Sequence, residues 1–304
     1  MTPSTRDFQD ASELGLSGGP EGSGRLSAHK ALLEEYLSHL AFSDNPHLVQ
    51  LVEAMRQSLL RENKRLRPLL CIEAASDFGL NPEDVLPSAA AIELVFAISQ
   101  IHDNLPGMDG RRRDVSRYSE EFGEATAILA GDGFFGEALS LITVHQKGRP
   151  ERVLQVVQQL AESTGVEGMV GGQSLSVDHA QPVTDRHNLE DIYELRWGSL
   201  IRASARIGAI LAGATSERQE AVADFAWHLG ICSRVAYEIT TAANDDGHRQ
   251  TLFIPALGLL GARNLGEKAV GRALVALEKT GVAMPGLSEL AAFVCGEAGI
   301  QVRD

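Results

Sequence analysis

Residues 100–113 place several groups that can do chemistry close together. Asp103 and Asp109 follow an apolar helical run, and the arginines of residues 111–113 come directly behind them. Carboxylate oxygens are hard ligands that suit Mg²⁺, which usually also contacts substrate phosphates. Arginine forks bind phosphate oxygens in pairs. The segment therefore predicts a magnesium–diphosphate site, although a polar loop whose charges pair with each other in water fits the same residues.

The composition favours one large helical domain. The chain has 304 residues, 44% of them hydrophobic and only 5% aromatic, and Ala, Leu, Glu and Arg favour helices over strands. A formal net charge of −14 argues against nonspecific nucleic-acid binding and against docking on anionic lipid, so any phosphate binding must come from local basic clusters. Cys71, Cys232 and Cys295 lie far apart, outside metal-ligand spacings, as expected for reduced thiols in the cytoplasm. No signal peptide and no charge-free apolar span are visible.

The pattern along the chain indicates an arm followed by a bundle. Residues 1–26 are rich in Gly, Ser and Pro and are expected to be a disordered N-terminal arm. Residues 27–304 show helical periodicity almost throughout. Within them the run Ala89–Ile101 carries one charge, Glu93, and a helix without a polar face is buried. The prediction is an all-α bundle with sites between facing helices. Helices are expected over about 46–62, 66–79, 83–104, 122–145, 150–175, 188–214, 217–243, 255–261, 266–279 and 286–298.

Three short motifs could serve either packing or ligand binding. The segment Lys64–Pro68 places three cations at a helix start, where the helix dipole disfavours them, so it could receive a phosphate or be a solvated charge run. The triplet Gly171–Gln173 allows close helix packing. The segment Leu129–Asp132 ends on a carboxylate that is either buried in an apolar helix or placed at a helix start.

Taken in order, these motifs resemble the trans-isoprenyl diphosphate synthases, the polyprenyl synthetase family. The resemblance covers residues 27–304 and implies an isoprenoid synthase helical bundle around a central cavity. It also implies two facing aspartate motifs that hold Mg²⁺ on the diphosphate of an allylic substrate, whose carbocation is attacked by isopentenyl diphosphate. The matching segments are Lys64–Pro68, Asp103–Asp109, Arg112–Arg113, Leu129–Asp132, Gly171–Gln173 and Arg196–Gly198.

The resemblance implies roles for individual residues and a dimer. Its metal ligands fall on Asp103, Asp109 and Asp245, and Arg112 joins the first two as a catalytic group. The family pairs through central helices, here Ala89–Ile101 and residues 122–145, so a homodimer is expected. Ile98 falls where a large aromatic ring would stop the growing chain, which implies a product of C15 or longer. The substrate-binding positions are Lys64, Arg65, Arg112, Arg113, Gln173 and Arg196.

Several positions depart from the family pattern. Asn104 stands where the first motif has its second aspartate. The second motif falls on residues 241–245 and keeps only its last carboxylate, although Glu238 or Asp246 could replace a lost ligand. Phe96 stands where the family has histidine, and Trp197 where it has threonine. Because Mg²⁺ needs near-octahedral oxygen ligation, fewer or weaker Mg²⁺ sites are expected than in the family.

Three functions fit these matches and departures. The first is a divergent prenyltransferase that condenses an allylic prenyl diphosphate with isopentenyl diphosphate, and the retained basic pairs favour it. The second is a non-catalytic subunit that forms a heterodimer with an active synthase, which the eroded second motif would explain. The third is a terpene cyclase, which needs one diphosphate and no acceptor site.

Overall fold

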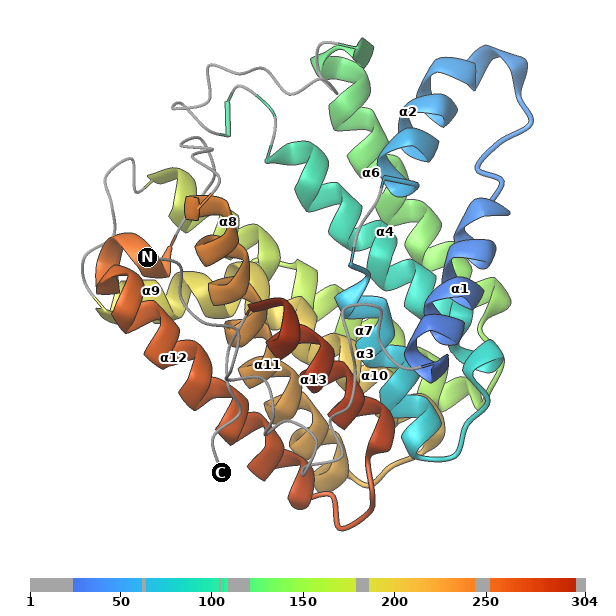
Figure 1. Ribbon diagram of the computed structural model, residues 1–304. Coiled ribbons are helices and arrows are strands. Elements are labelled where there is room, and N and C mark those ends of the chain that lie inside the picture. The colour runs from blue at the N-terminus through green and yellow to red at the C-terminus, as the bar shows by residue number, and fades with distance from the viewer. Residues whose placement is uncertain are drawn as a thin grey trace.

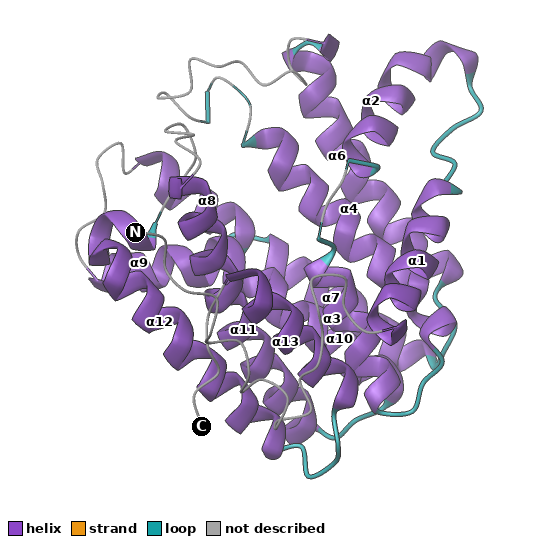
Figure 2. Ribbon diagram, viewed as in Figure 1, coloured by secondary structure: helices purple, strands orange, loops and turns teal. Residues whose placement is uncertain are grey.

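The computed structural model describes residues 24–61, 64–103, 105, 107–108, 121–178, 186–243 and 252–298, and every regular element in these ranges is helical (Figures 1 and 2). The all-α prediction is therefore confirmed. Short 3₁₀ turns, η1 (Pro46–Leu48) and η2 (Pro82–Val85), precede α2 and α4. The helices are α1 (Gly24–Ser38), α2 (Val49–Leu59), α3 (Leu66–Asp77), α4 (Leu86–His102), α6 (Glu124–Ser140), α7 (Pro150–Thr164), α8 (Met169–Asp178), α9 (Arg186–Tyr193), α10 (Ser199–Ala212), α11 (Ser216–Ala243), α12 (Phe253–Glu278) and α13 (Pro285–Ala298).

The first helix begins inside the expected N-terminal arm. Residues 1–23 lie outside the described part of the chain, but α1 starts at Gly24. Leu26 is buried, and Arg25 bonds the carboxylates of Glu73 and Asp77 on α3 at 3.1 and 2.8 Å. These contacts explain why the end of the arm is helical: its side chains reach partners that no local pattern reveals.

The helical block expected over 150–175 is interrupted, whereas the block expected over 188–214 is helical without a break from residue 188 to residue 212. The first breaks at residues 165–168, between α7 and α8. The second continues through a π-helical turn, η4 (Glu194–Gly198), which joins α9 to α10. Single π turns inside helices are rare and often mark functional sites. For the two blocks expected over 255–261 and 266–279, the break falls at a different place. Residues 262–265 are helical, and the backbone of α12 leaves the helical region at Gly258 instead, with φ 69° and ψ 166°.

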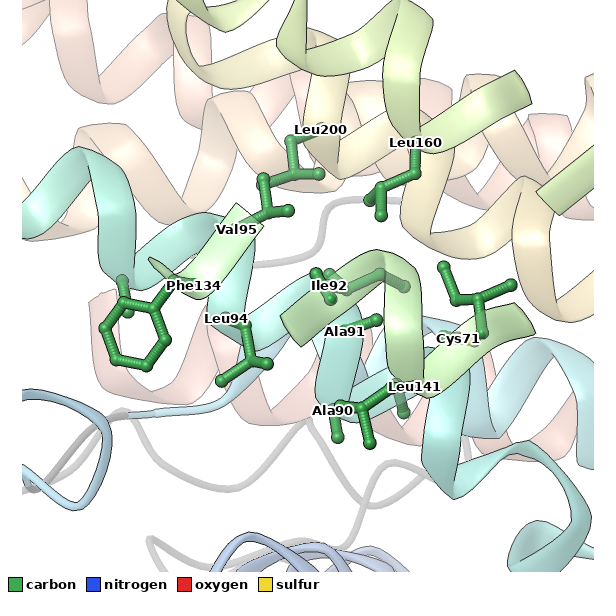
Figure 3. Packing of buried hydrophobic residues seen from close by; sticks show 14 of the residues in the cluster. Cys71, Ala90, Ala91, Ile92, Leu94, Val95, Phe134, Leu141, Leu160 and Leu200 are labelled. Atoms are coloured by element: carbon green, nitrogen blue, oxygen red, sulfur yellow. The ribbon is translucent and has the colours of Figure 1, made fainter. Parts of the chain in front are cut away.

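The centre of the bundle is α4, which packs against α3, α6 and η3, a π turn over Leu141–His145. Ala90, Ile92 and Leu94 on this helix have no exposed surface, as the lack of a polar face predicted. Figure 3 shows them among apolar side chains of α6, α7 and α10, including Phe134, and the shared apolar contacts stabilise the packing. A second apolar cluster joins α10, α11, α12 and α13.

Within the described residues, two helical stretches are apolar and long enough, by length and composition, to cross a membrane. The first, Pro82–His102, is 72% buried inside the bundle and is its core helix. The second, Glu124–His145, is only 39% buried. On this helix, α6, the side chains of Ile128, Leu129 and Phe135 are 45%, 56% and 38% exposed.

Candidate active site

Asp103 and Arg196 meet between α4 and η4. Asp103 caps the C-terminal end of α4, and its Oδ1 accepts a hydrogen bond from Nη2 of Arg196 at 2.9 Å. Arg196 is 7% exposed, whereas the Asp103 side chain is 25% exposed. The structure thus brings together two predicted site residues that are far apart in sequence, one expected to bind metal and the other to bind substrate.

Gly172 is what lets α8 approach this pair. A Cβ at Gly172 would overlap the backbone N of Arg196, so any larger residue would push α8 away from η4. The packing interpretation of Gly171–Gln173 therefore holds. Gln173, predicted to bind substrate, follows on the same helix, and its buried Nε2 lacks a hydrogen-bond partner among the residues that the structure describes. Because buried amides normally have partners, this atom is suited to a ligand, and its role in substrate binding stays a prediction.

Two arginines stack on the ring of Trp197. The guanidinium carbon of Arg196 lies 4.6 Å from the ring centroid, and that of Arg234 on α11 lies 4.2 Å from it. Tyr193, at the end of α9, packs beside Trp197 and is 1% exposed, and its hydroxyl has no hydrogen-bond partner within the described ranges. Burial raises the pKa of Tyr193, against the opposing charges of Arg67 and Arg234. The result is a buried, cation-rich wall.

Arg67 is a site residue that the sequence analysis did not select. Its guanidinium lies 3.7 Å from the ring centroid of Phe96, and its buried Nε has no hydrogen-bond partner in the described part of the chain. Burial lowers the pKa of Arg67 to about 10, opposed by the charge of Glu93. A buried charge without hydrogen-bonded partners is unfavourable, so an anion beside Arg67 would be stabilised. The signal was present in the segment Lys64–Pro68, in which Arg67 is the third cation.

Arg65, by contrast, is engaged inside the bundle. It is 2% exposed, and its guanidinium donates to Glu93 at 2.6 Å and to Glu34 at 2.8 Å. It also has φ 55°, the one positive φ outside glycine in the described residues, and this left-handed backbone turns it inward. Lys64 remains exposed at the surface. Diphosphate binding by Lys64 and Arg65 stays a prediction, and for Arg65 it would require these ion pairs to open.

Glu238 has a structural role. It has no exposed surface, and its oxygens accept hydrogen bonds from the backbone N–H groups of Leu252, Phe253 and Ile254 at 2.7–3.0 Å. Arg234 Nε donates to it as well, at 2.9 Å. The carboxylate thus caps the N-terminus of α12, where negative charge is favourable. Because both of its oxygens already accept hydrogen bonds, Glu238 is not suited to replace a lost metal ligand.

Asp132 is not buried, contrary to one reading of its motif. It is exposed in the middle of α6, so it does not lie at a helix start either. The neighbouring Gly131 does face the interior, because a Cβ there would overlap the ring of His102. Gly131 thus permits a close contact between α6 and α4.

Only part of the expected metal site can be placed. Asp103 fits Mg²⁺, since it offers a partly exposed hard carboxylate with one oxygen outside the pair with Arg196. The described residues contain no group of three His, Cys, Asp or Glu side chains that could hold a metal. The remaining predicted members, Asp109, Arg112, Arg113, Asp245 and Asp246, lie outside the described residues, and their convergence stays a prediction.

An all-helical bundle with a carboxylate and several arginines between its helices has the architecture of an isoprenoid synthase. A family model described as polyprenyl synthetase matches residues 49–236. Farnesyl diphosphate synthase from Geobacillus stearothermophilus is 32% identical over 254 residues, covering 78% of this chain and 85% of the relative. Farnesyl diphosphate synthase from Bacillus subtilis is 37% identical over 219 residues, covering 70% and 73%.

A solved structure shares the fold. The apo FPP/GFPP synthase from Zymomonas mobilis superposes with a TM-score of 0.77 at 25% identity, covering 89% of this chain and 98% of that one. This chain therefore belongs to the polyprenyl synthetase family, which confirms the resemblance drawn from its motifs.

Proposed function

We propose that this chain is a prenyltransferase that condenses an allylic prenyl diphosphate with isopentenyl diphosphate. The observation that carries the proposal is the pairing of Asp103 with Arg196 beside Trp197, on a wall that also holds Arg67 and Arg234. Ionisation of an allylic diphosphate leaves growing negative charge on the departing group. Preorganised cations in a site that excludes water stabilise that charge strongly. Its farnesyl diphosphate synthase relatives support this reaction class.

Among the described residues, some would bind the substrate anion and others orient the groups that bind it. Arg196 orients the carboxylate of Asp103, while Arg67 and Arg234 add positive charge for an anionic group. Phe96 and Tyr193 exclude water around these charges. Asp103, with Asp109 from outside the described residues, would hold Mg²⁺, which supplies further charge for the leaving diphosphate.

We further infer that the chain uses fewer or weaker Mg²⁺ sites than the family norm. Asn104 removes one carboxylate, and Glu238 is occupied as a helix cap. Calorimetric titration of Mg²⁺ in the presence of diphosphate measures the number of bound ions. Three tightly bound metals per chain would contradict this inference.

The direct test of the activity is product formation. The purified chain is incubated with Mg²⁺, isopentenyl diphosphate and dimethylallyl, geranyl or farnesyl diphosphate in turn, and the extracted products are sized by chromatography. We expect a product that disappears in Asp103→Asn. Wild-type protein that binds these diphosphates without forming product would contradict the enzyme and favour a non-catalytic subunit.

One relative and one surface support the heterodimer that the subunit alternative requires. A heterodimeric geranylgeranyl pyrophosphate synthase large subunit from Arabidopsis thaliana is 37% identical over 195 residues, covering 62% of this chain and 53% of the relative. The exposed apolar face of α6, with Ile128, Leu129 and Phe135, suits a large hydrophobic interface. The other predicted interface helix, α4, is already buried within one chain. We therefore assign dimerisation to α6.

Light scattering tests this assignment. We expect a homodimer for the wild type and a monomer for Leu129→Glu, with Val275→Glu on α12 as a matched exposed control that stays dimeric. Product formation by the homodimer supports the enzyme. An inactive homodimer that exchanges into a heterodimer with an intact synthase supports the subunit, and a wild-type monomer contradicts the interface.

A further inference from the structure

A basic groove lies between α11 and α12, outside the candidate active site. The two helices pack side by side (Figure 1). The groove holds about 380 Å³, and Asp224 and His228 of α11 form one wall. The other wall is a stripe on α12, comprising Lys268, Gly271, Arg272, Val275, Ala276 and Lys279. These spacings of three, four and seven residues place the stripe on one helix face.

The cations of this stripe are exposed and available. Lys268, Arg272 and Lys279 make no ion pair or hydrogen bond within the described part of the chain. The acidic residue of the opposite wall is already engaged, since Asp224 lies 3.5 Å from Arg202. Three unneutralised cations in one groove are unusual for a chain with a net charge of −14, and local potential concentrates anions at such a place.

A purely structural role, in which the helix dipole stabilises the cations, accounts for only part of the stripe. Lys279 follows the last residue of α12, where the negative end of the helix dipole favours a cation. Lys268 and Arg272 lie in the interior of the helix, one turn apart and about 6 Å along its axis, where the dipole has no such effect. Gly271 leaves the floor beside them open, because a Cβ there would meet no atom within 4 Å.

We propose that this groove binds a small phosphate-bearing anion through Lys268 and Arg272, with Lys279 adding charge at its far end. The two interior cations are close enough to contact one diphosphate group together, and arginine suits paired phosphate oxygens. A groove of this volume is within the range of small-molecule sites. The site is separate from the Asp103–Arg196 pair and does not depend on the proposed reaction.

His228 lines the groove and therefore provides a local readout of anion binding there. It is half-buried, and its pKa is lowered by burial and by Arg272, Arg202 and Lys279, with Asp224 acting in the opposite direction. An anion bound between Lys268 and Arg272 would offset these positive charges and raise the pKa of His228. The imidazole signal of His228 is identified in proton NMR spectra as the one that is absent from His228→Gln.

The probe is inorganic diphosphate in the presence of a chelator, titrated into the full chain at several pH values. We expect it to raise the pKa of His228 in the wild type and in Arg263→Gln, an exposed arginine on α12 outside the groove. In Lys268→Gln/Arg272→Gln, folded by circular dichroism, we expect binding at least about tenfold weaker, because two charge-assisted contacts are lost. An unchanged pKa in the wild type, or an equal response in the double variant, overturns the proposal.

A second arm separates the soluble ligand from a membrane. Vesicles of anionic phospholipid are sedimented with the wild type and with the double variant, and neutral vesicles serve as the control. Sedimentation that is lost in the double variant, without a response of His228 to diphosphate, overturns the proposal in favour of membrane docking. A response to diphosphate without sedimentation supports it.

Discussion

The carboxylate of Asp103 accepts a hydrogen bond from the guanidinium of Arg196 at 2.9 Å, joining the end of α4 to the π turn before α10. This ion pair links a predicted metal ligand to a predicted substrate cation. A bound diphosphate would compete with Asp103 for Arg196, and a metal would compete with Arg196 for Asp103. The pair therefore holds both groups in place and can be exchanged for ligand contacts.

We expect Arg196→Gln to lower kcat/KM by about 10²–10³, because one preorganised charge at the leaving group is lost. Arg196→Lys should retain more activity, since it keeps the charge but loses the guanidinium geometry. Steady-state kinetics measure both variants. Arg206→Gln, whose partners Gln159 and Glu220 lie elsewhere, is the matched control. Near wild-type kinetics for Arg196→Gln would remove Arg196 from the active site.

Glu238→Gln separates the cap from a metal ligand. We expect the free energy of unfolding to fall by about 2–4 kcal/mol. The substitution removes the negative charge that accepts hydrogen bonds from three backbone N–H groups and from Arg234. Urea unfolding measures the loss, and Glu278→Gln at the exposed end of α12 is the control. The number of Mg²⁺ ions bound by calorimetry should not change. A lost ion without lost stability would show that Glu238 is a ligand after all.

Gly172→Ala should disturb the site through packing. The new methyl group would overlap the backbone of Arg196, and overpacking of this kind costs about 1–3 kcal/mol. We expect lower stability together with lower activity, measured by urea unfolding and by product formation. Gly296→Ala on α13, where the space is open, should be neutral or slightly stabilising. Equal behaviour of the two variants would argue against the close approach of α8 to η4.

Product length provides a test of the pocket floor. Ile98 is partly buried on α4, one helical turn and a half before Asp103. If the chain is active, we expect a product of C15 or longer, and Ile98→Phe should shorten it because a larger ring blocks the growing chain. Chromatography of the extracted prenyl alcohols measures the distribution, with Ile98→Leu as the size-matched control. An unchanged distribution in Ile98→Phe would place the floor elsewhere, for example at Phe96.

The sequence determined the helical class, the buried central helix and the family. The helical class and the buried helix follow from local rules, because helix propensity and apolar periodicity act within a few residues. The family follows from motifs that occur in the expected order along the sequence. The run Ala89–Ile101 was predicted to be buried because it lacks a polar face, and it forms α4. The candidate residues Asp103 and Arg196 were also found by motif alone, although nothing local showed that they meet.

Tertiary structure decided which charges are available and which are engaged. Arg65 and Arg67 are two residues apart in one basic motif, yet Arg65 is buried against Glu34 and Glu93 while the buried Nε of Arg67 has no hydrogen-bond partner among the described residues. The positive φ of Arg65 and the distant carboxylates cause this difference. Likewise Glu238 looks like a free carboxylate in sequence and is a helix cap in space. Ionic roles depend on partners that folding brings from distant segments, and residue types alone do not encode them.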